Sequence, residues 1–519
     1  GVAVKKPIID RSSIVNNSIT YQNTFGKHKI NASLLYSREN RYGSSTLTTV
    51  KNFANPLLGY NNLSLGTLPT ASSEAWEENS ISYMARANYT YLNRYILTGT
   101  IRRDGFSGFG GDNKYASFPS VSAGWVATEE SFLKNLEWLY LKLRTSYGVN
   151  GNQGTGVYGR YASLSQMGTD AYAFGSATAS AVYPTTIGNP NLGWEKTTSF
   201  NTGLDYAFFD HRISGSIDIY NSKTSNVLVT RKLPTTSGYA FIYTNIGGIE
   251  NNGIELSLKT ENFRGEFNWT TNFSFSMNRD KITEIYGDGK DDLGSSWFIG
   301  KPISAIYDYT NTGVVWTEQE FFNGDTKVLK DGWYPGNFKY DDLNKDGVID
   351  ANDKSIIGYK TPNYRFSIQN SLTYQNFTLS FVINSIQGGD GYYLANNAKG
   401  INVGSNYTEV DRMNQLAVRP YWTPDNGVTN ATGIYNAQPL QTTSLYQDRS
   451  FVRLQDVSLS YNFNPALLRS LKLANCQFFL SGKNLYTWTK WSGWDPETGI
   501  TTADAPVMRN VTTGFKITL

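Results

Sequence analysis

The stretch TTSFNTGLDYAFFDHRISGSIDIYN, residues 197–221, is the part of the sequence that decides the fold. Bulky or apolar side chains recur at almost every second position on both sides of the turn at 210–212, and small or polar residues stand between them. Because side chains on a strand alternate between two faces, this pattern predicts an antiparallel hairpin with one apolar and one hydrated face. A strand of a soluble sandwich has the same alternation. The number of repeats and the lengths of the connections must therefore decide between the two folds.

The alternation recurs along the whole chain. In 265–279, for example, Phe267, Trp269 and Phe273 alternate with polar residues. Most of these segments are long enough to cross a bilayer at a tilt, whereas strands of soluble proteins average about five to six residues. We predict fifteen strands, at 17–26, 28–39, 77–92, 94–104, 117–127, 137–149, 195–209, 211–222, 250–261, 265–279, 363–375, 376–388, 450–463, 474–486 and 508–519.

The predicted connections alternate in length. Short links follow the odd-numbered strands, and long links follow the even-numbered ones, at 40–76, 105–116, 150–194, 223–249, 280–362, 389–449 and 487–507. Outer-membrane barrels have short periplasmic turns and long extracellular loops, whereas a sandwich has no reason to keep this parity. The sequence therefore predicts an all-β fold, a transmembrane antiparallel β-barrel wall with short periplasmic turns and long extracellular loops.

The composition agrees with this prediction and excludes several function classes. Net charge is only +3, so no nucleic-acid partner is expected. Cys476 is the single cysteine, which excludes an internal disulfide framework, and two histidines leave little for nucleophilic or zinc chemistry. The sequence contains no HExxH motif and no nucleophile elbow. We therefore expect that the protein is not an enzyme.

The strand count predicts that further strands precede this chain. Bacterial barrels normally have an even number of strands and both ends in the periplasm. The last predicted strand runs toward the periplasm and ends at Leu519, so residues 1–16 are expected to begin on the extracellular side. An odd number of strands, about seven, is then expected before Gly1. Residues 1–519 are interpreted as the C-terminal part of a larger barrel.

Several motifs, taken together in their order and spacing, resemble the C-terminal half of SusC/RagA-type TonB-dependent transporters of Bacteroidetes-like bacteria. The resemblance covers nearly everything from residue 17 to residue 519. It implies a barrel of about 22 strands, an even number as in other bacterial barrels. The motifs are YMARANYTY at 83–91, RRDGFS at 102–107, FPSVSAGW at 118–125, LRTSYGVNGNQ at 143–153, LGWEK at 192–196, NIGGIENNGIEL at 245–256 and WDPE at 494–497.

The resemblance also implies a function. Such transporters import oligosaccharides or peptides across the outer membrane with energy delivered by TonB to an N-terminal plug. They work with a SusD-like surface lipoprotein. Neither a plug nor a TonB box is recognised in residues 1–519. A structural barrel subunit of a larger outer-membrane complex, a generic TonB-dependent receptor and a passive porin remain as alternatives.

Residues 342–353, DLNKDGVIDAND, match the template of a calcium-binding loop. Oxygen-bearing side chains stand at loop positions 1, 3, 5 and 12, and Gly347 at position 6 allows the sharp turn. The residue at position 12 is Asp instead of Glu, and an acidic hairpin turn would be the simpler explanation. We predict a structural calcium site in the long extracellular loop 280–362, with ligands from Asp342, Asn344, Asp346, Val348, Asp350 and Asp353.

The strand phase predicts which side chains face the lumen. If Leu139, Leu141 and Leu143 face lipid, the residues between them point inward. These inward residues are expected to hydrate the interior, to hold a plug or to contact cargo. By this phase the charged lumen-facing candidates are Arg86, Arg102, Lys142, Arg144, Asp205, Asp218, Arg365 and Lys516.

Trp488, Trp491 and Trp494 mark the end of the predicted strand 474–486 and the start of a long loop. Such residues stack on sugar rings, but aromatic residues also form the girdle of a barrel at the membrane interface. We favour the girdle for Trp488. Both interpretations stay open for Trp491 and Trp494.

Overall fold

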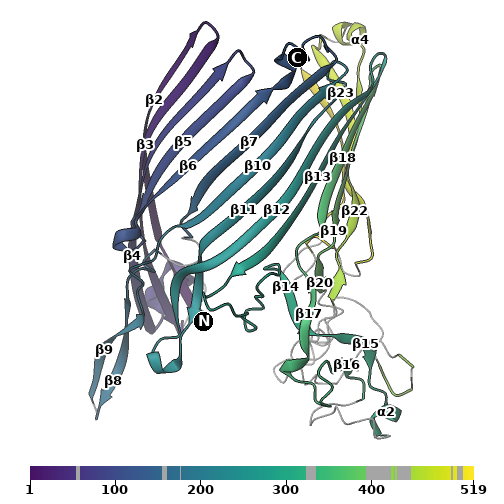
Figure 1. Cartoon of the computed structure of the whole chain (residues 1–519). Coiled ribbons are helices and arrows are strands. Elements are labelled where there is room, and N and C mark those ends of the chain that lie inside the picture. Colours follow the sequence, from purple (N-terminus) through teal and green to yellow (C-terminus); the bar gives the residue numbers. More distant parts are fainter. Residues whose placement is uncertain are drawn as a thin grey trace.

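A computed structural model describes residues 1–53, 59–154, 160–175, 177–322, 335–392, 422–425, 427–428, 446–470, 472–491, 495–498 and 507–518. Their main element is one antiparallel sheet of 16 strands, which bends into a trough-shaped wall (Figure 1). Strands β1 and β2 both pair with β3, so the wall has the fifteen strand positions that the sequence predicted. No helix among these residues is long and apolar enough to span a bilayer.

Neighbouring strands of the wall follow one another in the chain, apart from the small strands inside the loops. The wall strands are β1 (Val2–Lys5), β2 (Ile8–Phe25), β3 (His28–Lys51), β4 (Leu68–Tyr91), β5 (Tyr95–Phe106), β6 (Tyr115–Val126), β7 (Leu139–Asn152), β10 (Glu195–Phe208), β11 (Ile213–Lys232), β12 (Phe241–Phe263), β13 (Phe267–Glu284), β18 (Tyr364–Tyr374), β19 (Phe377–Gln387), β22 (Phe451–Asn462), β23 (Asn475–Thr489) and β24 (Asn510–Thr518).

The alternation of short and long connections is confirmed. Short turns and helix α4 (Pro465–Ser470) lie along one rim, and the long connections lie along the other (Figure 1). We call these the turn rim and the loop rim. The loops contain β8 (Gln166–Phe174), β9 (Ala177–Thr186), β14 (Ala305–Tyr309), β15 (Asn311–Val315), α2 (Glu318–Phe322), β16 (Phe338–Tyr340), β17 (Lys354–Tyr359), β20 (Asp390–Tyr392) and β21 (Tyr446–Asp448).

Several strands are longer than the sequence predicted. Strands β3 and β4 have 24 residues each and pair over their whole length, from His28–Tyr91 to Lys51–Leu68. A strand of that length extends about 80 Å, far more than the hydrocarbon core of a bilayer requires. The predicted loop 40–76 is therefore mostly strand, and so is much of 223–249. These hairpins extend from the loop rim, where neither face meets lipid and the apolar alternation is no longer needed.

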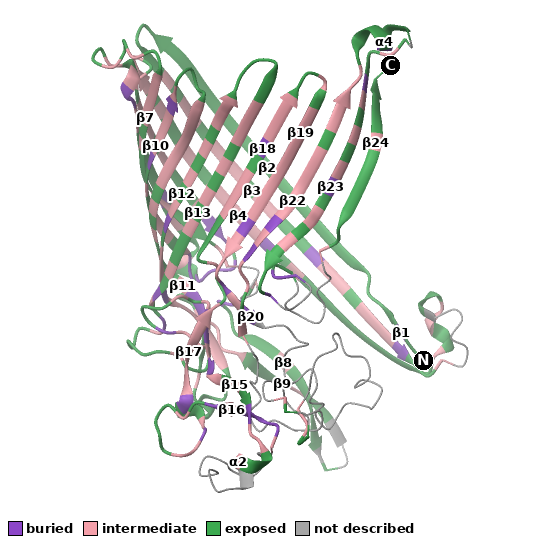
Figure 2. Ribbon diagram, turned by 90° about the vertical axis from the view of Figure 1, so that its right-hand side faces the viewer, coloured by how far each residue is buried: buried purple, intermediate pink, exposed green. Residues whose placement is uncertain are grey.

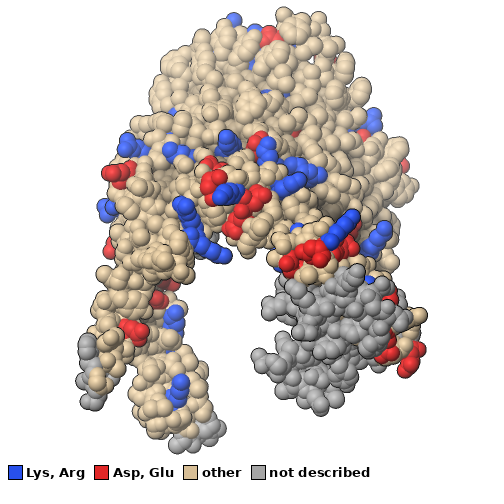
Figure 3. All heavy atoms as spheres, turned by 60° about the horizontal axis from the view of Figure 1, so that its bottom comes forward, with Lys and Arg blue, Asp and Glu red and all other residues tan. Residues whose placement is uncertain are grey.

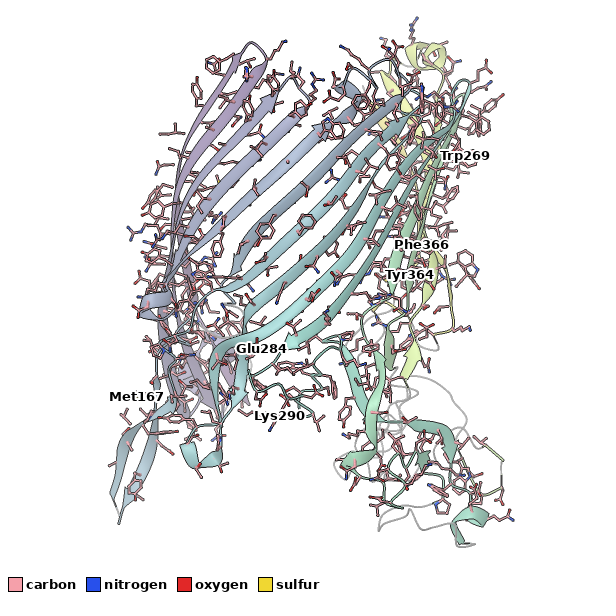
Figure 4. All side chains as sticks on the ribbon, viewed as in Figure 1. Met167, Trp269, Glu284, Lys290, Tyr364 and Phe366 are labelled. Atoms are coloured by element: carbon pink, nitrogen blue, oxygen red, sulfur yellow. The ribbon has the colours of Figure 1, made fainter. Side chains whose placement is uncertain are left out.

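The register sorts the side chains of the wall onto two faces. Leu143 pairs with Trp125 and Leu204, whereas Arg144 pairs with Gly124 and Gly203. Residues that pair directly across an antiparallel ladder share a face, so one face is apolar and the other is polar. On the apolar face, Trp269 lies near the turn rim, and Phe366 and Tyr364 lie farther toward the loops (Figure 4). We call the two faces outer and inner.

A compact apolar core lies where β5, β6, β10 and β11 meet the loops. Phe109 and Trp194 pack edge to face with 5.2 Å between ring centroids, and Phe118 also packs edge to face with Trp194 at 5.4 Å. Figure 2 shows buried residues at this level of the wall. We call this set the loop-root cluster, and its buried members are Phe106, Phe109, Phe118, Ala162, Leu192, Trp194 and Leu228.

Candidate functional site

Four predicted lumen residues come together on the inner face. The guanidinium of Arg144 on β7 contacts Asp205 on β10 and Asp218 on β11, each at 2.8 Å, and Lys142 lies 3.6 Å from Asp205. The four side chains are between 17% and 33% exposed, so they remain partly hydrated. The row contains two cations and two carboxylates in close contact, so this hydrated surface carries little net charge.

Gly203 makes the crossing of Arg144 possible. It pairs with Arg144 on one side and with Asp218 on the other. A Cβ atom at this position would lie 2.6 Å from Asp218 Oδ1 and 2.8 Å from Arg144 Cζ. The absence of a side chain on β10 therefore leaves the space through which the guanidinium reaches from β7 to β11.

The same row continues to a polar recess. Asp218 pairs with Glu255, Glu255 with Ser276, and Ser276 with Arg365. These residues, with serines of the neighbouring strands, line a recess of about 330 Å³. Neither Glu255 nor Arg365 takes part in an ion pair among the described residues. This recess is therefore one part of the inner face whose charges are left for a ligand or a partner domain.

The other predicted lumen residues lie apart from this row. Arg102 on β5 forms an ion pair with Asp104 at 2.8 Å and donates to Ser82 Oγ at 3.0 Å. Arg86 on β4 pairs with Thr100 and shares the inner phase of Arg102. Lys516 lies on β24, and its phase is opposite to that of Phe515, which packs on Phe478. From the loop side, charged residues gather around the hollow mouth, while the visible wall above it is mostly uncharged (Figure 3).

Two residues of the predicted calcium loop have a left-handed backbone. Gly347 at position 6 has φ of 79°, and Lys345 at position 4 has φ of 61°. The two oxygens of Asp342 accept hydrogen bonds from the backbone nitrogens of Lys345 and Gly347, at 2.7 and 2.9 Å. The carboxylate of Asp353 is fully buried and accepts from the nitrogens of Leu343 and Asp350, at 2.9 and 2.8 Å.

The donor set of this loop fits a hard cation in its chemistry but only partly in its arrangement. Carboxylate, amide and carbonyl oxygens are the ligands that calcium prefers. However, no group of three or more His, Cys, Asp or Glu side chains in the described part of the chain is gathered tightly enough to hold a metal ion. Asp353 in particular is already engaged by two backbone nitrogens, and it closes the loop onto the start of β17.

The predicted tryptophans lie in different surroundings. Trp488 pairs with Val452 on the outer face, is 51% exposed and packs on Tyr486 with 4.9 Å between ring centroids. Trp491 is only 5% exposed, so its ring offers no open surface to a sugar. Trp494 lies outside the described residues.

One buried charge cluster was not predicted. Arg453 on β22 is 4% exposed and contacts Asp495 at 2.5 Å and Glu497 at 2.8 Å. Arg449 donates to the carbonyl oxygens of Pro496 and Glu497, at 2.7 and 3.0 Å. Two arginines therefore hold the segment 495–498 against the wall. The motif at 494–497 was visible in the sequence, but its partners lie more than 40 residues away, and nothing in their spacing indicated the contact.

Hydrogen bonds tie three loops to the loop-root cluster. The side chain of Asn245 forms two hydrogen bonds with the backbone of Gly193, both at 2.8 Å. Trp194 Nε1 donates to the Lys114 carbonyl at 3.0 Å, and Glu195 Oε1 accepts from the Leu228 nitrogen at 2.7 Å. The roots of the connections after β5, β7 and β11 are thus one packed unit. Four of the sequence motifs, at 102–107, 118–125, 192–196 and 245–256, converge here.

Residues 9–485 match the model of the family described as TonB dependent receptor-like, beta-barrel. The chain belongs to the TonB-dependent receptor β-barrel family. Membership explains the two faces of the wall, because these receptors are integral proteins of the outer membrane. The outer face of this receptor therefore meets lipid. Its turn rim faces the periplasm, and its loop rim faces the outside of the cell.

Similar proteins place this receptor among the SusC/RagA type. It is 32% identical over 504 residues to TonB-dependent receptor P3 of Formosa agariphila, covering 94% of this chain and 49% of that protein. It is 31% identical over 431 residues to TonB-dependent receptor SusC of Bacteroides thetaiotaomicron, covering 80% of this chain and 41% of that protein. The structure of the RagAB peptide transporter superposes with a TM-score of 0.79 at 25% identity, over 99% of this chain and 56% of that one. The chain spans about half the length of these relatives.

Proposed function

We propose that this receptor imports oligosaccharides or peptides across the outer membrane in a TonB-dependent manner. The observation that carries the proposal is the polar inner face, with paired charges along its strands and large loops on its outward rim alone. A related structure is described as a peptide transporter, which supports peptides as one class of cargo. A SusD-like surface lipoprotein is the proposed partner at the loop rim. A plug outside residues 1–519 is the proposed partner on the inner face and the link to TonB.

The inner face supports this function in two ways. The row Lys142, Arg144, Asp205 and Asp218 keeps the wall hydrated while most of its charge is balanced. The neighbouring recess presents Glu255 and Arg365 without ion-pair partners among the described residues, so it is suited to a polar plug surface or to passing cargo.

Uptake by the native bacterium tests the proposal. A strain that lacks the gene should fail to accumulate one class of labelled oligosaccharide or peptide, and a plasmid copy should restore uptake. Dissipating the inner-membrane proton gradient should abolish uptake in the complemented strain. Normal accumulation in the deletion strain would contradict the proposal.

Two alternatives predict different outcomes. A passive porin would conduct ions steadily when the full-length protein is placed in a planar bilayer, and its uptake would survive loss of the proton gradient. A structural subunit of a larger complex would leave uptake unchanged on deletion but would release other surface proteins from the membrane. The described part of the chain contains no feature that favours either alternative over import.

We further propose that the loop 342–353 binds calcium as a structural ion. The ligand spacing and the left-handed backbone at Lys345 and Gly347 support this. Asp342, Asn344, Asp346, Asp350 and Asp353 with the Val348 carbonyl would hold the ion, and the ion would join carboxylates that otherwise repel. Chelation should increase hydrogen exchange in 335–363, and calcium but not magnesium should reverse the increase. Identical exchange with and without chelator would refute a bound ion.

A further inference from the structure

The outer face of β2 to β5 carries a groove that is separate from the lumen. Outward side chains of four strands line a recess of about 650 Å³, including Ile19, Leu34, Tyr83, Ala85, Ile101 and Arg103. A second recess of about 600 Å³ shares Ile19, Leu34, Ala85 and Ile101 with the first and adds Ala32, Ala87 and Gly99. The two are therefore one groove along the lipid-facing wall. Small residues on neighbouring strands form its floor.

Two arginines lie at the loop end of this groove. Arg103 pairs with Tyr83, and its guanidinium lies 5.5 Å from the centre of the Tyr115 ring. Arg38 pairs with Ile81 and donates to Asn40 Oδ1 at 3.3 Å. Both side chains are exposed, and neither has an ion-pair partner among the described residues. Arginine in this state presents a planar fork of donors that matches a phosphate group.

The position of the arginines agrees with the level of lipid headgroups. Arg38 is ten residues along β3 from His28 at the turn rim (38 − 28), a height of about 26 Å once strand tilt is included. The apolar band of such barrels is about 25 Å tall. Between these levels, the outward positions of β2 to β6 include no Asp or Glu. The patch is thus apolar below and cationic at its outer edge.

We propose that the groove binds a phosphorylated lipid of the outer leaflet. One acyl chain would lie along Ala85 and Gly99, and Arg38 and Arg103 would contact the phosphate. Charge complementarity selects this ligand, because two unpaired guanidiniums at the interface favour an anionic headgroup over a neutral one. The chain contact needs only the small residues of the floor, which leave room that larger side chains would fill.

Native mass spectrometry of the full-length receptor tests this proposal. The purified protein is incubated with monophosphoryl lipid A or with the same lipid after dephosphorylation, and bound lipid is measured. Wild type should retain the phosphorylated lipid at least tenfold better. The double variant R38A/R103A should lose this preference. Lys196→Ala, which removes a cation from the outward face of β10, should retain it.

A variant of the groove floor tests the acyl contact independently. A Cβ atom at Gly99 would meet nothing within 4 Å, so Gly99→Leu fills the groove without disturbing the wall. This variant should retain several-fold less of both lipids while it migrates as folded barrel on unheated gels. Equal retention of the two lipids by wild type would overturn the proposal. So would full displacement by inorganic phosphate, which would indicate a simple anion site, or an equal loss in Lys196→Ala, which would indicate general surface charge.

Discussion

Arg144 on β7 reaches across β10 to Asp218 on β11, with 2.8 Å between Nη2 and Oδ2. The contact spans two strand spacings, and Gly203 lies directly beneath it. The long side chain of Arg144 can therefore reach the carboxylate of Asp218 because Gly203, between them, has no side chain.

Replacing Gly203 with valine should separate Arg144 from Asp218. The new side chain would occupy the space of the guanidinium, so the ion pair would loosen and its partly hydrated groups would lose about 1 kcal/mol. If samples are heated to a series of temperatures before electrophoresis, the temperature at which the band of the folded barrel disappears should fall. Gly99→Val is the matched control, because a side chain there meets open space. If the two variants unfold at the same temperature, the contact between Arg144 and Asp218 contributes nothing to stability.

Asp495→Asn should release the segment that the two arginines hold. Arg453 is almost fully buried, and loss of its closest carboxylate would leave its charge with only Glu497, at a cost of a few kcal/mol. Hydrogen exchange in peptides covering 487–491 and 495–498 should rise. Glu497→Gln should have a much smaller effect, because that carboxylate is 41% exposed. The opposite ranking would show that the exposed partner holds the segment.

Asp353 and Asp346 should respond differently to substitution. Asp353→Ala would remove a fully buried carboxylate and leave the backbone nitrogens of Leu343 and Asp350 without this acceptor, at a cost of roughly 1–3 kcal/mol in total. Exchange in 335–363 should therefore rise in this variant with or without calcium. Asp346→Asn should keep the turn and abolish only the protection that calcium gives. If both variants respond alike, Asp353 has no role beyond that of an ion ligand.

The hydroxyl of Tyr286 should lose its proton at a higher pH than that of an ordinary tyrosine. Burial, together with the hydrogen bond that its hydroxyl donates to Asp292 at 2.8 Å, raises the pKa of Tyr286 to about 12. The folded value lies above the ordinary 10, so the contribution of this tyrosine to loop stability is complete below pH 10 and is lost as the pH rises through 12. Ultraviolet difference spectra of wild type and Tyr286→Phe should isolate the late transition. A difference signal centred near pH 10 would show that the hydroxyl is not held.

The membrane-spanning part of the fold could be predicted because lipid imposes a period of two. Phe267, Trp269 and Phe273 had to alternate with polar residues, so β13 was visible in the sequence. Beyond the bilayer this constraint ends, and residues 68–76 form a strand without an apolar alternation. The small strands of the loops, such as β14 and β17, were missed for the same reason.

For the candidate site, the sequence predicted only the face of the wall on which each side chain lies. Strand phase correctly gave the shared face of Lys142, Arg144 and Asp205, but their mutual contacts depend on register, which no single strand encodes. The contacts that hold 495–498 against the wall depend on the path by which a loop returns to it. Its arginines, Arg449 and Arg453, have no neighbours in sequence that reveal the role.

The bonds between Asn245 and Gly193 restrict how the mouth can open. We expect the bases of the three loops to move as one body, because Trp194 and Leu228 are packed in the same cluster. Any hinge that opens the loop rim must therefore lie out along the loops, beyond this shared base, or else tilt all three loops together.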